Sequence, residues 1–256
     1  MGGTAAQDVA GLAAALAAGG AGLRLDLQPI CAAATLAPVG YEALLRWEHP
    51  DLGPVPPMEV LAAAEAAGRG VALEAWVMVN AFRLRARWPR GGPFLAVNVS
   101  ADGLLGGHAG PMVRAALDAT RVDPRGLMLE LPEAAVVQDL GLAAGLAAQL
   151  RGTGIAVALD DFGGRLGPAR ALRDIPFVAV KIDAAMTAGL DGEGPLADRA
   201  RAAVAAVVDM AHALGATATA EAVESAAQLR ALREAGCDAL QGWLLGRPGP
   251  DQPQIR

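Results

Sequence analysis

Polar side chains recur at the ends of short apolar segments in this chain of 256 residues. Five of them are carboxylates, and one is the only lysine in a chain that contains twenty arginines. A lysine ammonium is a compact charge that can hold a water or a phosphate oxygen, and burial readily shifts its pKa. The residues concerned are Glu42, Asn98, Glu130, Asp160, Asp161, Lys181, Glu221 and Gln241.

The five carboxylates would bring more negative charge together than nearby cations can balance. Two like charges 4 Å apart repel by about 4 kcal/mol at an effective dielectric constant of 20. Lys181 and Arg46 cannot neutralise five acids, so either several acids are protonated or divalent metals bind among them. Oxygen ligands with an asparagine and no Cys or His favour Mg²⁺ or Mn²⁺ over Zn²⁺. Two such ions bridged by a carboxylate are an arrangement for in-line hydrolysis of a phosphodiester.

Alternating strand and helix patterns predict how these side chains are brought together. Alternation implies a parallel sheet with helices outside it, and eight strands in 256 residues suit a closed (β/α)₈ barrel. In such a barrel the chemistry lies at the C-terminal ends of the strands. The predicted strands span about 23–30, 40–46, 94–99, 127–131, 155–160, 177–182, 216–221 and 239–244, and the main predicted helices span 57–68, 73–88, 111–120, 133–151, 195–214 and 224–235.

One connection departs from the parallel pattern. Only nine residues, Cys31 to Val39, separate the first two strands, whereas a parallel crossover normally needs about a dozen or more. We therefore expect an α/β fold, a modified TIM barrel whose first strand is antiparallel. We expect residues 1–22 to form a helical lead-in within the same domain and residues 23–256 to form the barrel, because no linker is long enough to divide the chain.

Composition argues against several other classes of protein. A net charge of −6 disfavours binding of a nucleic acid polymer, which normally requires a basic face. Cys31 and Cys237 are the only cysteines and lie far apart, so the chain predicts neither a disulfide framework nor a zinc site and fits a reducing cytoplasm. The chain contains no stretch of about 18 apolar residues without charges, so we predict no membrane span in it. An enolase-like lyase would also use strand-end acids and a lysine base, but it needs a capping domain for which this chain has no room.

Eight short motifs resemble those of the EAL-domain cyclic di-GMP phosphodiesterases of bacterial signalling. The name-giving Glu-Ala-Leu stands at residues 42–44, and the motifs keep the family's order and spacing from about residue 23 to residue 248. The resemblance implies a modified barrel with an antiparallel first strand, in agreement with the short connection. The matching motifs are QPI (28–30), EALLRW (42–47), VNVS (97–100), LELPE (129–133), LDDFG (159–163), VKID (180–183), AEAVE (220–224) and QGWLLGRP (241–248).

The resemblance also implies a reaction and a role for each matched residue. The reaction would be metal-dependent opening of cyclic di-GMP to linear pGpG, with Mg²⁺ or Mn²⁺ at a two-metal site. Lys181 would hold the attacking water, and Glu221 would orient that water or accept its proton. Gln28 and Arg46 would contact the substrate, and Gln241 would complete the network of water and metal beside it. The implied metal ligands are Glu42, Asn98, Glu130, Asp160 and Asp161, with Asp160 shared between the ions.

Three positions depart from the family's pattern. After DDFG the family usually continues Thr-Gly-Tyr-Ser-Ser, whereas residues 164–168 of this chain read Gly-Arg-Leu-Gly-Pro. In the family this loop shapes the second-metal site and a homodimer contact, and the acid that matches Glu133 supports it. Pro132 replaces a usual Thr, and Ala222 replaces a usual Gly. We therefore expect weaker binding of the second metal and reduced activity. The alternative function is a weak or inactive EAL module that binds cyclic di-GMP or a protein partner.

Overall fold

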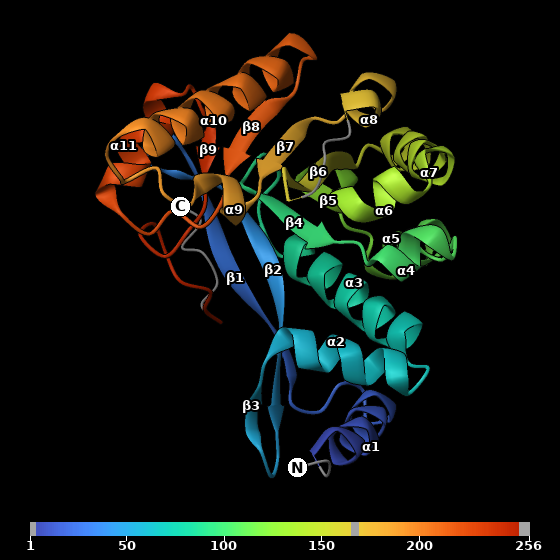
Figure 1. Cartoon of the computed structure of the whole chain (residues 1–256). Coiled ribbons are helices and arrows are strands. Elements are labelled where there is room, and N and C mark those ends of the chain that lie inside the picture. The colour runs from blue at the N-terminus through green and yellow to red at the C-terminus, as the bar shows by residue number, and fades with distance from the viewer. Residues whose placement is uncertain (1–3, 165–168, 251–256) are drawn as a thin grey trace.

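Eight strands close into a barrel with helices around its outside (Figure 1). The computed structural model describes residues 4–164 and 169–250. The sheet order is β1-β9-β8-β7-β6-β5-β4-β2-β3, and an additional pairing of β1 with β2 closes the ring. The strands are β1 Leu23–Ala32, β2 Pro38–His49, β3 Gly53–Val55, β4 Phe94–Asn98, β5 Leu127–Pro132, β6 Ala156–Phe162, β7 Ala179–Ile182, β8 Thr217–Ala220 and β9 Ala239–Leu240.

Helices follow most of the strands, as the alternating pattern predicts. Several of them begin at side chains that satisfy the first backbone N–H groups; Ser225, for example, forms a reciprocal capping pair with Gln228 at the start of α11. The helices are α1 Thr4–Ala17, α2 Pro57–Ala66, α3 Gly70–Ala86, α4 Ala101–Leu105, α5 Ala109–Thr120, α6 Glu133–Gln138, α7 Leu140–Thr153, α8 Ala169–Asp174, α9 Ala184–Thr187, α10 Pro195–Ala213 and α11 Ala226–Glu234.

The first strand is antiparallel to both of its neighbours, which confirms the prediction from the short connection. Strand β1 pairs with β2 in a register that places Gln28 opposite Glu42. It meets β9 through Cys31 and Ala32. The remaining barrel strands, from β2 through β4 to β9, pair in parallel. The fold is therefore the modified TIM barrel that the sequence predicts.

Two predicted elements differ from the structure. The single helix expected over 133–151 is two helices, because Asp139 takes an extended conformation and its side chain accepts a hydrogen bond from Leu142 N. The last strand ends at Leu240 instead of 244, since the chain turns away at Gln241 and Gly242. A Cβ on Gly242 would lie 2.2 Å from the backbone of Val223, so only glycine fits this close approach.

The core lies mainly between the barrel and the surrounding helices. Leu95, Leu127, Leu129, Val157 and Val180 belong to its main cluster and are completely buried. A second cluster forms where the long β1–β2 ribbon extends beyond the barrel toward α1 and α2 (Figure 1). The packed barrel leaves the carboxyl ends of the strands to position polar groups. Among the described residues, no helix combines the length and apolar character needed to cross a membrane.

Candidate active site

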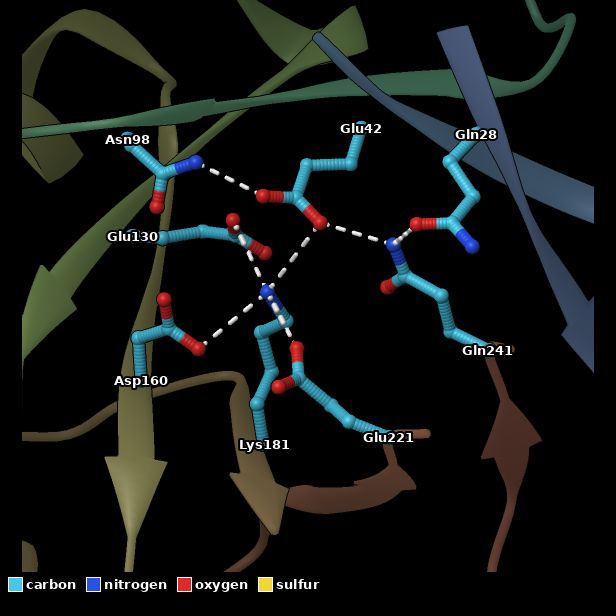
Figure 2. Close-up of polar contacts among 8 residues, drawn as sticks. All are labelled: Gln28, Glu42, Asn98, Glu130, Asp160, Lys181, Glu221 and Gln241. Atoms are coloured by element: carbon cyan, nitrogen blue, oxygen red, sulfur yellow. Dashed lines mark hydrogen bonds and ion pairs between the residues drawn. The ribbon is translucent and has the colours of Figure 1, made fainter. Parts of the chain in front are cut away.

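The polar residues predicted at the strand ends meet at one end of the barrel (Figure 2). Asn98 and Glu130 are register partners on the parallel strands β4 and β5. Lys181 lies on β7 opposite Thr219, one residue pair before β8 ends and Glu221 follows. A cleft of about 470 Å³ opens above them. Its lining includes Gln28, Glu42, Asn98, Asp160, Asp161, Lys181, Glu221 and Gln241.

Lys181 lies in the middle of four carboxylates (Figure 2). Its ammonium is buried, with the residue only 2% exposed. The distances from its Nζ atom are 2.7 Å to Oε1 of Glu221, 3.0 Å to Oε2 of Glu130, 3.1 Å to Oδ1 of Asp160 and 3.6 Å to Oε2 of Glu42. An ammonium has three N–H donors, and three carboxylates lie within hydrogen-bond distance of it. A donor can therefore hold a water only after one of these acids finds another partner.

Glu42 is held by two amide side chains in addition to the lysine. Asn98 Nδ2 donates to its Oε1 at 2.7 Å, and Gln241 Nε2 donates to its Oε2 at 2.7 Å. The same Gln241 nitrogen lies 3.1 Å from Oε1 of Gln28, whose Nε2 donates to Gly246 O at 3.2 Å. Residues from β1, β2, β4 and the segment after β9 thus form one hydrogen-bonded group beside the lysine.

The acids around Lys181 differ in their proton affinity. Burial raises the pKa of Glu42, but Lys181 and the two amide donors outweigh this effect, and the pKa lies below its usual value. Burial raises the pKa of Glu130 well above its usual value despite the nearby lysine. Burial also raises the pKa of Glu221, to about 7, although the charge of Lys181 partly opposes this rise. Burial alone would lower the pKa of Lys181, but the surrounding acids raise it well above its usual value, so the lysine stays charged.

Asp160 and Asp161 are consecutive residues that both line the cleft, because the strand is irregular there. The register between β6 and β7 shifts between Leu159 and Phe162. Asp161 has φ of 59°, a left-handed backbone conformation that residues other than glycine adopt infrequently. Such irregularities often re-aim side chains next to functional sites. Carboxylate oxygens of Asp160, Asp161 and Glu221 consequently lie within 4.8 Å of one another.

These oxygens fit a divalent cation. Apart from Lys181 Nζ, both oxygens of Glu130 and Oδ1 of Asp160 meet no hydrogen-bond donor within the described ranges, although they are buried. Oε1 of Gln241 is likewise buried without a donor there. Buried polar atoms normally have a partner, and those that lack one suggest a missing ion or water. Oxygen ligands of this kind suit Mg²⁺ or Mn²⁺.

Arg46 does not pair with Glu42, the acid on its own strand face. Its Nε lies 3.3 Å from Oδ2 of Asp26, a buried acid on the neighbouring strand β1. Arg24 reaches the other oxygen of Asp26 at 3.1 Å. The period of two along β1 puts Asp26 and Gln28 on one face, but sequence reasoning did not select Asp26. Asp26 fixes one side of the Arg46 guanidinium, and Arg46 is not among the described residues that line the cleft.

Two further acids brace the segments that carry the site. Glu133 accepts a hydrogen bond from Gly163 N at 2.8 Å, just after Asp160 and Asp161. Glu74 on α3 accepts from the backbone N and the hydroxyl of Ser100, at 3.0 and 2.8 Å, two residues after Asn98. The sequence signals the first contact through the LELPE motif, whereas Glu74 lies inside a helical pattern without a distinguishing signal.

The structure describes some of the positions that depart from the family's motifs. Ala222, which replaces the family's usual Gly, has φ of 52° and is therefore left-handed. An alanine in this conformation costs roughly 1–2 kcal/mol. Pro132 precedes α6 as its N-cap residue. Residues 165–168 of the altered loop lie outside the described residues, and the expected weakening of the second metal site stays a prediction.

Trp243 is a residue at the cleft that sequence reasoning did not single out. It follows Gln241 within the QGW motif, lines the cleft and is 54% exposed. The guanidinium carbon of Arg247 lies 4.3 Å from the centre of its ring. An exposed aromatic face at a cleft edge is suited to stacking on a flat ligand.

Comparison with known proteins places this chain in a family. The model of the EAL domain matches residues 12–248. The chain belongs to the EAL domain family. The match covers all eight motifs and every predicted site residue, and an EAL domain of this kind is homologous to cyclic di-GMP phosphodiesterases.

Two relatives of this EAL domain are named as cyclic di-GMP phosphodiesterases. It is 36% identical over 233 residues to the bifunctional diguanylate cyclase/cyclic di-GMP phosphodiesterase MucR of Pseudomonas aeruginosa, covering 89% of this chain and 33% of MucR. It is 32% identical over 229 residues to a cyclic di-GMP phosphodiesterase of the same organism, covering 89% of this chain and 38% of the relative. The chain therefore spans about a third of the length of these relatives.

Several solved structures share the fold over nearly the whole chain. The MucR phosphodiesterase in complex with cyclic di-GMP superposes with a TM-score of 0.87 at 34% identity, covering 95% of this chain and 98% of that one. The FimX EAL domain of P. aeruginosa bound to cyclic di-GMP gives 0.85 at 28% identity, covering 95% and 97%. A calcium and cyclic di-GMP complex of BlrP1 from Klebsiella pneumoniae gives 0.79 at 28% identity, covering 93% and 58%.

Proposed function

We propose that this EAL domain hydrolyses cyclic di-GMP to linear pGpG with Mg²⁺ or Mn²⁺. The observation that carries the proposal is the buried Lys181 ammonium among four carboxylates at the base of an open cleft. Homologues with the same fold are bound to cyclic di-GMP, which supports the choice of ligand. A module that only binds the dinucleotide would not need a lysine and an acid of near-neutral pKa in contact.

The reaction needs a water that adds to phosphorus while one phosphodiester P–O bond breaks. In our proposal a Lys181 N–H donates to this water and sets its position. Glu221, whose Oε1 lies 2.7 Å from the ammonium, accepts the proton that the water loses. Its pKa of about 7 suits a general base near neutral pH. The leaving sugar oxygen takes up a proton as the ring opens.

The carboxylates would hold the metal ions that this chemistry needs. Glu42, Asn98, Glu130, Asp160 and Asp161 are the proposed ligands, and Glu221 lies close enough to Asp160 and Asp161 to join them. Bound divalent ions would neutralise the phosphate charge and promote ionisation of the attacking water. A carboxylate that binds a metal ion would no longer accept from Lys181. This would free a Lys181 N–H to donate to the water.

Substrate contacts come from the edges of the cleft in this proposal. Gln241 donates to both Gln28 and Glu42, so the two glutamine amide groups are already ordered. Arg46 would contact a phosphate, while Asp26 holds its guanidinium on the other side. A guanidinium can donate to two oxygens in parallel, which suits a phosphate better than a single point charge does.

Arg46→Gln should weaken binding of cyclic di-GMP by about 10- to 100-fold, the cost of one charged hydrogen bond to a phosphate. The measurement is calorimetric titration in excess chelator, so that the dinucleotide is not consumed. Arg114→Gln, which removes an exposed arginine of α5, is the matched control and should bind like the parent. Equal affinity in the Arg46 variant would remove Arg46 from the proposed substrate site.

The concentration of Mg²⁺ that half-saturates the site should fall as the pH rises from about 6 to about 8. Metal ligands must be deprotonated, and protons compete with the ion below the pKa of each acid. Burial raises the pKa of Glu221 to about 7 and that of Glu130 well above its usual value, so both lose their protons only as the pH rises. Calorimetric Mg²⁺ titrations at several pH values test this. An affinity independent of pH would show that these acids do not compete with the ion.

A further inference from the structure

A second groove lies outside the cleft, between β1 and one face of α3. Its volume is about 350 Å³, within the size range of sites for small molecules. We propose that this groove binds a phosphate-bearing small molecule with a flat body, of the nucleoside monophosphate class. The proposal is independent of the phosphodiesterase function, because no residue of the acid and lysine cluster lines the groove.

One face of α3 forms the helical wall of the groove. Trp76, Asn80, Arg83 and Arg87 follow one another at intervals of four, three and four residues. Residues spaced in this way lie on one face of an α-helix. Arg87 is the residue that caps the C-terminal end of α3. The opposite wall comes from β1, where Leu23, Leu25 and Leu27 alternate along the strand. The groove therefore combines a polar helix face with an apolar strand.

The lining carries positive charge without acidic residues. Three arginines, Arg24, Arg83 and Arg87, line the groove, and its lining within the described part of the chain contains no Asp or Glu. Arg24 is partly neutralised, since it lies 3.1 Å from Asp26 and 3.6 Å from Glu48. Arg83 and Arg87 are exposed, and neither has a carboxylate within 4.0 Å in residues 4–164 and 169–250. Two unpaired guanidinium groups on one helix face, in a chain of net charge −6, favour an anion.

The other wall residues suit a flat body attached to that anion. Trp76 is half-buried, and its indole Nε1 donates to Gly19 O at 3.0 Å, which fixes the ring. A Cβ on Gly20 would lie only 2.0 Å from the same nitrogen, so glycine lets the chain pass close to the ring. Asn80 donates to Trp76 O at 2.8 Å, and its amide oxygen remains as an acceptor. An ordered indole beside an amide acceptor can take a planar ring that carries a donor group.

The two arginines suit phosphate and carboxylate oxygens alike, so the size of the groove decides between a small phosphate-bearing ligand and an acidic peptide. Guanidinium groups bind phosphate oxygens in pairs of parallel hydrogen bonds. The groove has a volume of only about 350 Å³, and Pro250 lines it together with the two walls. Its size favours a compact ligand over an extended acidic peptide, which becomes the competing outcome of the test.

The test is calorimetric titration of the whole chain with adenosine 5′-monophosphate in excess chelator. This probe lacks guanine, the base of the ligand proposed for the cleft. We expect saturable binding that weakens as salt concentration rises. Two control ligands separate the contributions of the phosphate and the flat body. Adenosine lacks the phosphate, and inorganic phosphate lacks the flat body. Each should bind at least about tenfold more weakly than the monophosphate, because each loses one set of contacts.

Two double variants identify the site. Arg83→Gln with Arg87→Gln should weaken binding of the monophosphate by about tenfold or more, by loss of charged hydrogen bonds. Arg114→Gln with Arg230→Gln makes the same change in net charge at exposed arginines outside the groove, and should leave binding unchanged. Thermal unfolding of both double variants verifies that they are folded. Absence of saturable binding, equal loss in both double variants, or tighter binding of an acidic peptide than of the monophosphate would each overturn the proposal.

Discussion

Lys181→Ala should reduce hydrolysis of cyclic di-GMP by about 100- to 10,000-fold, the range expected when a group that positions a proton transfer is lost. The variant lacks the ammonium that lies 2.7 Å from Glu221 and that we propose to hold the attacking water. Binding of the dinucleotide should change much less, because Gln28 and Arg46 lie on other strands. Product formation and calorimetric binding, measured on the same preparation, test this. Near-normal turnover would show that the lone lysine is incidental.

The same variant should also lose stability in the absence of metal. Removal of one partner from a buried ion pair typically costs about 3–5 kcal/mol, and Lys181 contacts four acids. The raised pKa values of Glu130 and Glu221 determine how this loss of stability changes with pH. Both acids are largely protonated at low pH and become charged as the pH rises, so the loss should grow with pH.

Divalent ions should restore much of this lost stability. Mg²⁺ would replace the missing positive charge, so it should raise the melting temperature of Lys181→Ala more than that of the parent. Lys181→Met is the control for side-chain volume, since it removes the charge but keeps an unbranched chain of similar length. If both variants melt like the parent in excess chelator, the lysine is not the counter-charge for these acids.

Removal of divalent ions should abolish hydrolysis, and Mg²⁺ or Mn²⁺ should restore it. The buried oxygens of Glu130 and Asp160 have only the lysine as a partner within the described residues. One ammonium cannot balance four nearby acids and a bound phosphate diester at the same time. The measurement is product formation in excess chelator, followed by re-addition of each ion. Undiminished hydrolysis in chelator would contradict a metal-dependent site.

The altered loop offers a quantitative extension of that experiment. Replacement of residues 164–168 by Thr-Gly-Tyr-Ser-Ser, the family's usual sequence, should lower the half-saturating metal concentration and raise turnover. The loop follows Asp160 and Asp161 closely, and Glu133 already braces Gly163 at its start. An unchanged metal dependence and turnover after the replacement would refute the proposed weakness of the second metal site.

The strands that carry the site could be predicted from the sequence because most of them end an apolar run with a polar residue. Asn98, Asp160 and Lys181 follow this rule, whereas Glu130 lies inside an apolar run, and parallel pairing then brings all four to one edge. The antiparallel first strand could be predicted from the length of one connection alone, because nine residues cannot complete a parallel crossover. Local patterns and simple geometry were sufficient for these features.

Other features depend on contacts that the sequence does not reveal. Arg46 pairs diagonally with Asp26 on the next strand, and this depends on the register of β1 and β2. The split of the helix at Asp139 could not be predicted from the continuous apolar pattern around it. The contacts of Lys181 with four acids at once required the closed barrel, which brings β2, β5, β6 and the end of β8 around β7.

The central claim is best tested by incubating the purified chain with cyclic di-GMP and Mn²⁺ and identifying the products by chromatography and mass spectrometry. We predict linear pGpG, formed in the parent at a rate far above that of Lys181→Ala and not formed in excess chelator. Recovery of intact cyclic di-GMP from the parent, together with tight binding of the dinucleotide, would contradict hydrolysis and identify this EAL domain as a binding module.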